Sequence, residues 1–317
     1  MTIRDLAILA RLPNLPTVWS NVIAGHLLAL WLGKQALHGT TVEPAFAAAT
    51  MAWLLGSATF LYLCGTFLND AIDADFDLRH RRDRPVPAGR ANRDSVLNLG
   101  MVAGIAGLAC AIPAGKHALA VAAILLACVL TYTWLHKRTT MASIFMALCR
   151  ACLPVLGASA VITRWGAEWH QPAGWLLAAA TMLGCYTLGV SLLARGESTG
   201  GPGIWLARAG TGLLCLPYFA PVLVALWIFC TNHEAAGWQT GAAIGISSSP
   251  GLGWVWYSAT AAAKRSIATM VSRALAGLAL VDIIILLPVW LVQPAILLLP
   301  ATAFTLALLC RRFVPST

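Results

Sequence analysis

The sequence contains little charge for its length. Only 10% of its 317 residues are charged, whereas an ordinary soluble domain has about 25%. A soluble chain of this length needs more polar surface to cover its core, so the composition excludes most soluble folds. The hydrophobic fraction of 59% and the mean hydropathy of +0.77 instead predict a multi-pass integral membrane protein that contacts the lipid bilayer, with no nucleic-acid partner.

Cysteine and histidine patterns typical of metal sites are also missing. The nine cysteines are scattered through apolar stretches, and only Cys149 and Cys152 have C-x-x-C spacing. No second pair or histidine follows at zinc-site spacing, so we interpret the thiols as small packing groups. A secretory signal is not evident either: residues 1–14 are polar and interrupted by proline, and we expect the first apolar stretch to be a retained span.

Long apolar stretches, separated by charged residues, proline and glycine, fill most of the chain. In lipid, a single segment satisfies its own backbone hydrogen bonds only as a helix, so each stretch predicts a transmembrane helix. The predicted spans lie near residues 17–33, 45–68, 95–113, 117–135, 141–162, 173–193, 211–230, 271–291 and 294–310. We therefore expect an all-α bundle of about nine transmembrane helices, forming one domain over residues 1–317.

The distribution of lysine and arginine predicts the orientation of the bundle. The N-terminal segment and the loops after the second, fourth and sixth spans are basic, which places them in the cytoplasm, as in a bacterial inner membrane. The basic residues around the last two spans break this pattern: Lys264, Arg265, Arg273, Arg311 and Arg312. A tenth span within residues 238–262 restores it; the alternative is that this Gly- and Ser-rich segment is interfacial or re-entrant.

Acidic residues are scarce, yet five of the twelve lie close together: Asp70, Asp73, Asp75, Asp77 and Asp83. If the helix of the second span continues past them, positions 69 or 70, 73 and 77 share one face. Crowded carboxylates repel one another unless a cation lies between them, and oxygen ligands suit Mg²⁺ better than Zn²⁺. We expect Asp70, Asp73 and Asp77 to be catalytic, with Asn69, Asp73 and Asp77 as metal ligands.

A dense basic loop, residues 78–90, follows the aspartates directly. Guanidinium groups such as that of Arg84 clamp phosphate oxygens through paired hydrogen bonds, while a metal ion neutralises the remaining charge. The acidic stripe and the basic loop together predict a diphosphate site. The alternative is that the arginines only set the topology and that the aspartates balance them.

These residues resemble the first signature of the UbiA superfamily of intramembrane prenyltransferases. The resemblance rests on Asn69-Asp-x-x-Asp73-x-x-x-Asp77, followed by Arg84-Pro85 and Gly89-Arg90. It extends through most of the first 160 residues. The segment from Arg11 through Asn14 to Asn21 is similar to the opening of the family, and Tyr132, Lys137 and Arg138 are similar to its tyrosine and basic pair that meet the diphosphate.

The resemblance implies a nine-helix bundle with a large cavity open to lipid. It implies an isoprenoid diphosphate bound with Mg²⁺, whose prenyl group passes to an aromatic or other lipophilic, electron-rich acceptor. Metal and basic groups would stabilise charge on the leaving diphosphate as the C1–O bond breaks. The residues implied are Lys137 as a catalytic group and Asn14, Asn21, Arg84, Tyr132 and Arg138 as substrate-binding groups. A wall of aromatic side chains would suit the prenyl cation, and some of the thirteen tryptophans could supply it, although we expect most of them at the bilayer interface.

The second aspartate-rich signature of the family, after the sixth span, is degenerate in this chain. From Tyr186 to Ser198 the only acidic residue is Glu197. Three interpretations stay open: Glu197 completes a weaker second metal site with Ser191 or Ser198, the protein binds one metal, or the usual activity is lost. Arg195 can stand in for a cation, because a guanidinium neutralises phosphate. At this place we expect Tyr186 and Arg195 to bind substrate and Glu197 to bind metal.

Two charged residues lie within predicted spans, Arg150 in the fifth and Asp282 in the eighth. Charges at that depth face the interior of a bundle and are paired. Arg150 is expected to be catalytic, reaching the diphosphate or the acceptor, and Asp282 is a candidate to orient or deprotonate the acceptor. For each of them, a structural hydrogen bond between helices is the alternative.

Two other functions are compatible with the motifs. A transporter or carrier would bind a phosphorylated lipid in the same pocket without reaction, although the halves of the chain show no clear inverted repeat. A UbiA-like terpene cyclase shares the first signature and captures the cation within the prenyl chain itself. The sequence favours the Mg²⁺-dependent prenyltransferase over both.

Overall fold

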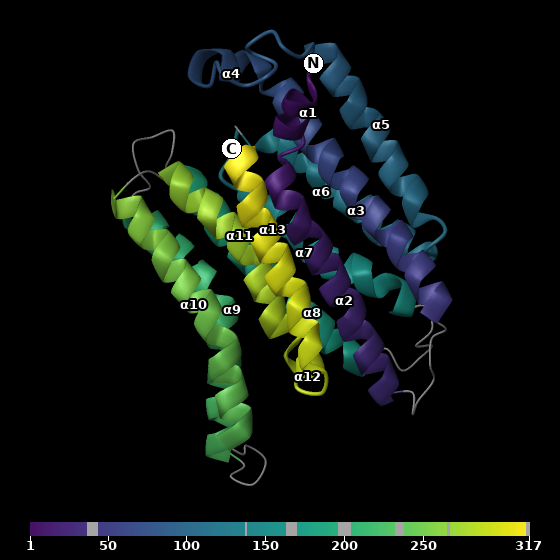
Figure 1. Cartoon of the computed structure of the whole chain (residues 1–317), viewed down its shortest axis with the longest axis vertical. Helices are drawn as coiled ribbons and strands as arrows, with labels where there is room; N and C mark the ends of the chain where they lie inside the picture. The colour runs from purple at the N-terminus through teal and green to yellow at the C-terminus, as the bar shows by residue number, and fades with distance from the viewer. Residues whose placement is uncertain are drawn as a thin grey trace.

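The protein is described here by a computed structural model, which is helical throughout its described residues and contains no strand among them. These are residues 1–36, 44–136, 138–162, 170–195, 204–231, 238–264 and 267–314. Ten long helices within these ranges form one elongated bundle (Figure 1). The all-α prediction is confirmed.

The chain alternates long helices with short helical turns. The long helices are α2 (Leu15–Ala36), α3 (Pro44–Ile72), α5 (Arg93–Ala111), α6 (Lys116–Leu135), α7 (Ala142–Ile162), α8 (His170–Arg195), α9 (Ile204–Thr231), α10 (Trp238–Lys264), α11 (Ile267–Ile285) and α13 (Leu298–Phe313). The short ones are α1 (Ile3–Leu9), η1 (Leu12–Asn14), α4 (Ala74–His80), α12 (Leu287–Trp290) and η3 (Pro294–Leu297). Eight helices that are long and apolar enough to cross a membrane lie among the described residues: α2, α3, α5, α6, α7, α8, α11 and α13.

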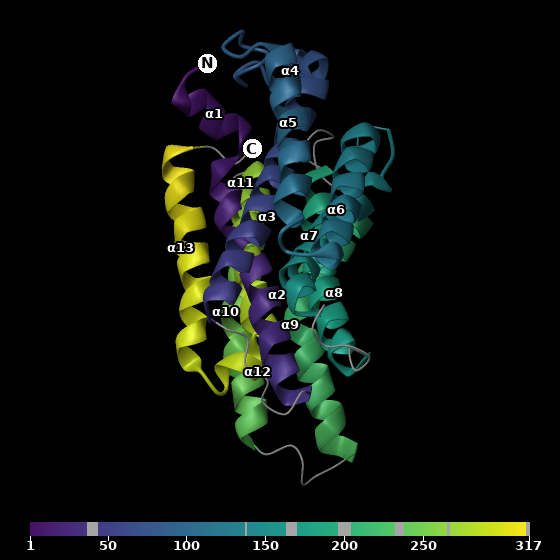
Figure 2. The same cartoon turned by 90° about the vertical axis from the view of Figure 1, so that its right-hand side faces the viewer.

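Helices α2 and α7 form the centre of the bundle, because each contributes to two clusters of buried apolar side chains. One cluster joins them to α8, α9 and α11, and the other joins them to α3, α5 and α6. Figure 2 shows these helices side by side along the long axis. Between the two clusters lies the space in which polar groups from both halves of the bundle meet.

Glycine allows α2 and α7 to approach closely. A Cβ atom on Gly157 of α7 would overlap the backbone carbonyl of Val22, and a Cβ atom on Gly25 of α2 would overlap that of Pro154. Small residues at such crossings let two helix backbones come into direct contact, which is how helices in lipid gain packing energy. The α2–α7 crossing is therefore fixed by backbone contact rather than by interlocked side chains.

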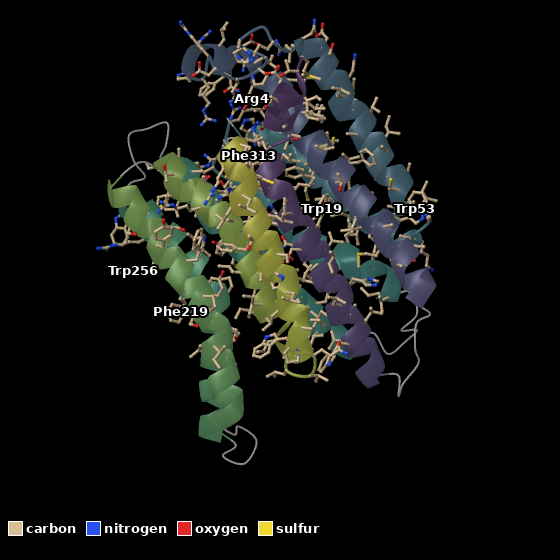
Figure 3. All side chains as sticks on the ribbon, in the orientation of Figure 1. Arg4, Trp19, Trp53, Phe219, Trp256 and Phe313 are labelled. Carbon is tan, nitrogen blue, oxygen red and sulfur yellow. The ribbon has the colours of Figure 1, made fainter. Side chains whose placement is uncertain are left out.

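The flanks of the bundle are apolar, whereas one end is polar. Trp53, Phe219 and Trp256 point outward from their helices in Figure 3, and Trp256 is 74% exposed. Nitrogen and oxygen atoms gather at the end that contains α1 and α4 (Figure 3). A surface with exposed aromatic flanks and a polar end matches a bundle that is surrounded by lipid.

Both ends of the chain lie at this polar end (Figure 1). The Nη2 group of Arg311, near the end of α13, donates to Oδ1 of Asn14 at 3.3 Å. Long helices that start and finish at the same end must cross the bundle an even number of times. The segment 238–262, for which the sequence left two alternatives, belongs to the long helix α10, which packs beside α9 and α11.

Candidate functional site

A cavity of about 420 Å³ opens among α2, α3, α6, α7, α8 and α11. Its polar lining comes mostly from helix ends at the polar end of the bundle: Arg11, Asn14, Asn69, Asp73, Asp77, Arg81, Arg84, Tyr132, His136, Ser143, Arg150 and Arg195. Its apolar lining includes Val18, Leu61, Leu125, Val129, Leu153, Val271 and Leu275. The cavity thus joins a charged end to an apolar wall.

The helix that carries the acidic motif bends at Asp73, so the condition of one unbroken helix past the aspartates is not met. Helix α3 ends at Ile72 and α4 begins at Ala74, so that α4 turns out of the line of α3 (Figure 1). Backbone N–H groups still bond four residues back, from Asp73 to Asn69 at 2.9 Å and from Asp77 to Asp73 at 2.8 Å. The helical register therefore survives the bend, and Asn69, Asp73 and Asp77 line one cavity.

Asp70 is not part of the lining of this cavity and joins three segments of the chain. Its Oδ1 accepts from Arg11 Nη2 at 3.0 Å and from Arg84 Nη1 at 3.2 Å. The same Nη1 of Arg84 also lies 2.8 Å from Oδ2 of Asp77. Asp70 is buried and does not line the cavity. In this structure it pairs with the two arginines and makes no direct contact with the cavity, so its catalytic role stays a prediction.

Arg11 occupies a strained position at the entrance to α2. Its φ of 43° lies in the left-handed region that residues with a Cβ atom seldom adopt. The hydroxyl of Tyr62 donates to its backbone carbonyl at 3.0 Å, and Asp70 holds its guanidinium. Strain of this kind persists only where surrounding contacts determine it, and here those contacts direct Arg11 to the cavity.

The carboxylate of Asp73 contacts a histidine that the sequence analysis left unassigned. Nε2 of His136 lies 3.0 Å from Oδ2 of Asp73, and its Nδ1 donates to the carbonyl of Thr133 at 3.0 Å. The His136 ring also stacks on Tyr132, with 5.3 Å between ring centroids. Asn69 Nδ2 donates to the same Asp73 oxygen at 3.4 Å. Residues from α3 and from the end of α6 thus converge on one carboxylate.

The oxygen donors of Asn69, Asp73 and Asp77 fit a Mg²⁺ ion. Mg²⁺ is usually held by one or two carboxylates together with water and substrate phosphates, rather than by a complete protein cage. No group of three His, Cys, Asp or Glu side chains gathers at one point in the described part of the chain, as a protein cage would require. Cys149 and Cys152 are free thiols. The donor set suits a hard cation shared with a substrate.

The opposite wall, on α8, carries a single arginine among its described cavity-lining residues. Nε of Arg195 donates to Oγ of Ser143 at 3.1 Å, and its Nη2 donates to the carbonyls of His136 (3.4 Å) and Thr139. Neutral side chains of α8 accompany it: Thr187, Val190, Ser191 and Ala194. Glu197, the expected metal ligand, lies outside the described residues.

Arg150 extends the polar lining deeper into the bundle. Its Nη1 donates to Oδ1 of Asn21 at 2.9 Å and its Nη2 to Oγ1 of Thr17 at 3.0 Å. Nδ2 of Asn21 donates in turn to Asp282 at 2.9 Å, and Ser20 donates to the same carboxylate. Arg150 lines the cavity, whereas Asn21 and Asp282 are fully buried behind it.

Two other expected residues, Tyr186 and Arg138, have different surroundings from those predicted. Tyr186 is fully buried away from the cavity, and its hydroxyl donates to the carbonyl of Ala274 at 2.9 Å. Arg138 is exposed over the ring of Trp134, 4.6 Å from its centroid, and does not line the cavity. Lys137 lies outside the described residues. Tyr186 and Arg138 therefore make no direct approach to a ligand in this cavity.

The cavity wall is mainly aliphatic, and its described lining includes no tryptophan, so the aromatic wall that tryptophans could have supplied is not found there. Its described aromatic lining consists of Tyr62, Phe76 and Tyr132. The indoles described on the surface, such as Trp53 and Trp256, are exposed on the flanks instead. These tryptophans lie at the surface that faces lipid rather than in the lining of the cavity.

The basic loop is fixed to the N-terminal helix. Arg90 Nε donates to Oδ1 of Asp5 at 2.9 Å, and its Nη2 donates to the carbonyl of Asp83. The backbone N–H of Thr2 and the guanidinium of Arg90 lower the pKa of Asp5 from its ordinary 3.8 to about 2, so this carboxylate stays ionised at neutral pH. Gly89 has a φ of 71°, which explains the glycine before Arg90.

Comparison with known proteins supports one family. A model of the UbiA prenyltransferase family matches residues 22–197. The chain is 28% identical over 221 residues to the protoheme IX farnesyltransferase of Geobacter sulfurreducens. The matched region covers 63% of this chain and 82% of that protein.

Solved structures share the fold. A UbiA homologue from Aeropyrum pernix K1 superposes with a TM-score of 0.59 at 14% identity, covering 84% of this chain and 94% of that one. A UbiA homologue from Archaeoglobus fulgidus, bound to GPP and Mg²⁺, superposes with a TM-score of 0.53 at 13% identity, covering 98% and 97%.

Proposed function

Since the chain belongs to the UbiA prenyltransferase family, we propose that this membrane prenyltransferase transfers the prenyl group of an isoprenoid diphosphate to an electron-rich, lipophilic acceptor and requires Mg²⁺. The observation that carries the proposal is the cavity itself, in which paired carboxylates and arginines at one end lead to an aliphatic wall. A diphosphate matches the charged end and a hydrocarbon chain matches the wall. The relative that prenylates protoheme supports a transfer reaction.

Asn69, Asp73 and Asp77 would hold the metal ion, which would neutralise phosphate oxygens and polarise the bond to the leaving group. Arg84 is held by Asp70 and Asp77 and offers its remaining N–H groups to the diphosphate. Tyr132 stacks on His136, and both side chains line the cavity. These groups bind the charge that develops on the diphosphate as the C1–O bond breaks.

The bond electrons leave with the diphosphate, and the allylic cation is attacked by the acceptor, which then loses a proton. Leu125, Val129 and Leu153 belong to the aliphatic wall, which excludes the water that would otherwise capture the cation. The chain itself forms no covalent intermediate in this scheme. Its contribution is to position the diphosphate and to keep the prenyl chain dry.

The charged end of the cavity faces the cytoplasm in this proposal, and the bilayer is a bacterial inner membrane. Arginine is concentrated at that end, in the loop of residues 78–90 and at the ends of α8 and α13. The positive-inside rule assigns such an end to the cytoplasm, where water-soluble short-chain isoprenoid diphosphates are available.

The proposal is tested with purified protein in nanodiscs. Radiolabelled geranyl and farnesyl diphosphates are supplied with bacterial membrane lipids and protohaem IX as acceptors, with Mg²⁺ or with EDTA. We expect Mg²⁺-dependent pyrophosphate release together with a prenylated product, and a loss of at least about 100-fold for Asp73→Ala. Asp75→Ala is the matched control, because its side chain is 80% exposed and pairs with Arg93 outside the cavity.

Two results would contradict this function. Saturable binding of the diphosphates without pyrophosphate release indicates a carrier of phosphorylated lipids. Pyrophosphate release that yields a cyclic hydrocarbon, whether or not acceptors are present, indicates a terpene cyclase.

A further inference from the structure

A residue of the last described helix contacts the lining of the cavity. Arg311 lies in the last turn of α13, and its Nη2 group donates to Oδ1 of Asn14 at 3.3 Å, although the two residues are 297 positions apart. Asn14 is buried and lines the cavity, whereas Arg311 is not part of the described lining. The side chain of Asn14 therefore connects the cavity to a cation outside it.

The contact with Arg311 determines the orientation of the Asn14 amide. A guanidinium only donates hydrogen bonds, so the atom of Asn14 that meets it must be the carbonyl oxygen. The side chain of Asn14 is also hydrogen-bonded to Tyr62, another cavity residue, whose hydroxyl donates to the carbonyl of Arg11. Since the Tyr62 proton is used in that bond, Nδ2 of Asn14 is the donor to Tyr62. The amide thus presents its N–H groups on the side of Tyr62 and the cavity.

The backbone of Asn14 is held in place by separate bonds. Its N–H donates to the carbonyl of Arg11 at 3.0 Å, and its carbonyl accepts from the hydroxyl of Thr17 at 2.7 Å. The main freedom left to the residue is rotation of its amide, on which Arg311 and Tyr62 act. This rotation matters for an anionic ligand, because an amide N–H attracts phosphate oxygens whereas an amide carbonyl repels them.

Arg311 is poorly placed for a residue that serves stability alone. Its Nε and Nη1 atoms are buried and have no hydrogen-bond partner in the described part of the chain. Buried donors without a partner cost folding free energy, and native structures keep few of them. Arg312, the next residue, is exposed. The single bond to Asn14 is therefore a weak structural reason for a guanidinium at position 311, and a role in the site explains it better.

We propose that Arg311 is a positioning residue of the diphosphate site, which holds the amide of Asn14 so that Nδ2 donates to the bound diphosphate. The proposal rests on the proposed function and names a residue that prepares its substrate site from outside the cavity. Arg311 acts through Asn14 and does not touch the substrate. Without it, the amide can turn its oxygen toward the cavity, where that oxygen repels phosphate.

The first test measures binding of inorganic pyrophosphate with Mg²⁺ by calorimetry on the full chain in detergent. Arg311→Met removes the donor that fixes the amide, and we expect it to weaken binding at least about 10-fold, as the loss of a hydrogen bond to a charged group does. Arg312→Met is the matched control, because it removes an exposed arginine from the same helix turn, and it should leave the affinity unchanged. Arg311→Lys keeps one donor for Oδ1 and should restore most of the affinity.

A double-mutant cycle tests whether Arg311 acts through Asn14. Asn14→Ala removes the amide itself and should weaken pyrophosphate binding at least as much as Arg311→Met does. In the Asn14→Ala background, Arg311→Met should cause no further loss, since the group that it positions is already absent. Losses that add would mean that Arg311 acts on the ligand independently of Asn14.

Thermal unfolding separates this role from a structural one. Arg311→Met exchanges one hydrogen bond for the removal of two unpaired buried donors, so we expect its melting temperature not to fall below that of the wild type. An Arg311→Met chain that no longer folds, unchanged affinity in that variant, or additive losses in the cycle would overturn the proposal while leaving the proposed transferase function intact. Failure of the wild-type chain to bind any isoprenoid diphosphate with Mg²⁺ would overturn both.

Discussion

Asp282 illustrates how a charge deep in this bundle is made tolerable. It is fully buried, and the only positive charge connected to it by the hydrogen bonds described above is Arg150, through Asn21. An isolated carboxylate at that depth is costly, so the amide of Asn21 and the hydroxyl of Ser20 share its charge with the guanidinium. Because Asp282 does not line the cavity, this structure favours its role in helix packing over direct contact with an acceptor.

Replacing Asp282 tests that role. Asp282→Leu removes the acceptor of the Ser20 hydroxyl and of Asn21 Nδ2, together with the buried negative charge that offsets Arg150, and the expected loss is about 3–5 kcal/mol of stability. Asp282→Asn keeps one acceptor oxygen and should cost about 1–2 kcal/mol. Thermal unfolding in detergent measures both. Asp75→Asn, at an exposed site, serves as control, and an unchanged melting temperature for Asp282→Leu would show that the network is not structural.

The acidic motif was accessible to sequence reasoning because its members are near neighbours in the chain. Asn69, Asp73 and Asp77 are four residues apart, so helical periodicity alone brings them together. The contact between Asp73 and His136 joins residues 63 positions apart, so no local sequence pattern predicts it. Tyr186 shows the converse: it was expected to bind substrate, but it packs against α11, where its hydroxyl donates to the carbonyl of Ala274.

At the scale of helices, the crossing of α2 and α7 decides where the cavity can lie. Both helices contribute cavity residues, including Val18 from α2 and Leu153 from α7. Gly25 and Gly157 bring their backbones into contact just below these residues. A wider crossing would shift Arg150 of α7 away from Thr17 and Asn21 of α2, whose bonds hold its guanidinium.

Gly157→Ala should therefore be destabilising. The added methyl group overlaps the carbonyl of Val22, which is backbone and cannot rotate aside, so we expect a loss of about 1–3 kcal/mol. Gly174→Ala is the matched control, since a Cβ atom there meets nothing within 4 Å and alanine favours a helix. Both are measured as melting temperatures in the same detergent. Equal tolerance of the two changes would mean that the crossing is looser than described.

Apolar length predicted most of the helices, and its failures have physical causes. The bend at Asp73 was not foreseen, because the residues around it are compatible with a continuous helix and the change in direction is accompanied by contacts with distant arginines. The segment 238–262 was ambiguous because glycine and serine make it weakly apolar. Its helix, α10, packs against α9 and α11. These contacts with distant parts of the chain cannot be predicted from the residues of the segment alone.

In the whole molecule, the distribution of charged residues and the course of the chain both indicate one polar end, which contains α1 and α4. Both termini and α4, from which the basic loop continues, lie there (Figure 1), and Asp77, Arg81 and Arg84 of this region line the cavity. A tenth crossing, by α10, would remove the conflict that a nine-span count leaves for Lys264, Arg273 and Arg311. These basic residues would then fall on the side of the N-terminus.

This topology predicts the behaviour of reporter fusions. Green fluorescent protein fluoresces only in the cytoplasm, and alkaline phosphatase is active only outside it. We expect fluorescence from fusions after Thr139 and after Val314, and phosphatase activity from a fusion after Thr231, between α9 and α10. Phosphatase activity after Val314, combined with fluorescence after Thr139, would require an odd number of crossings. Since α13 would then end opposite the N-terminus, that result would also exclude the contact between Arg311 and Asn14.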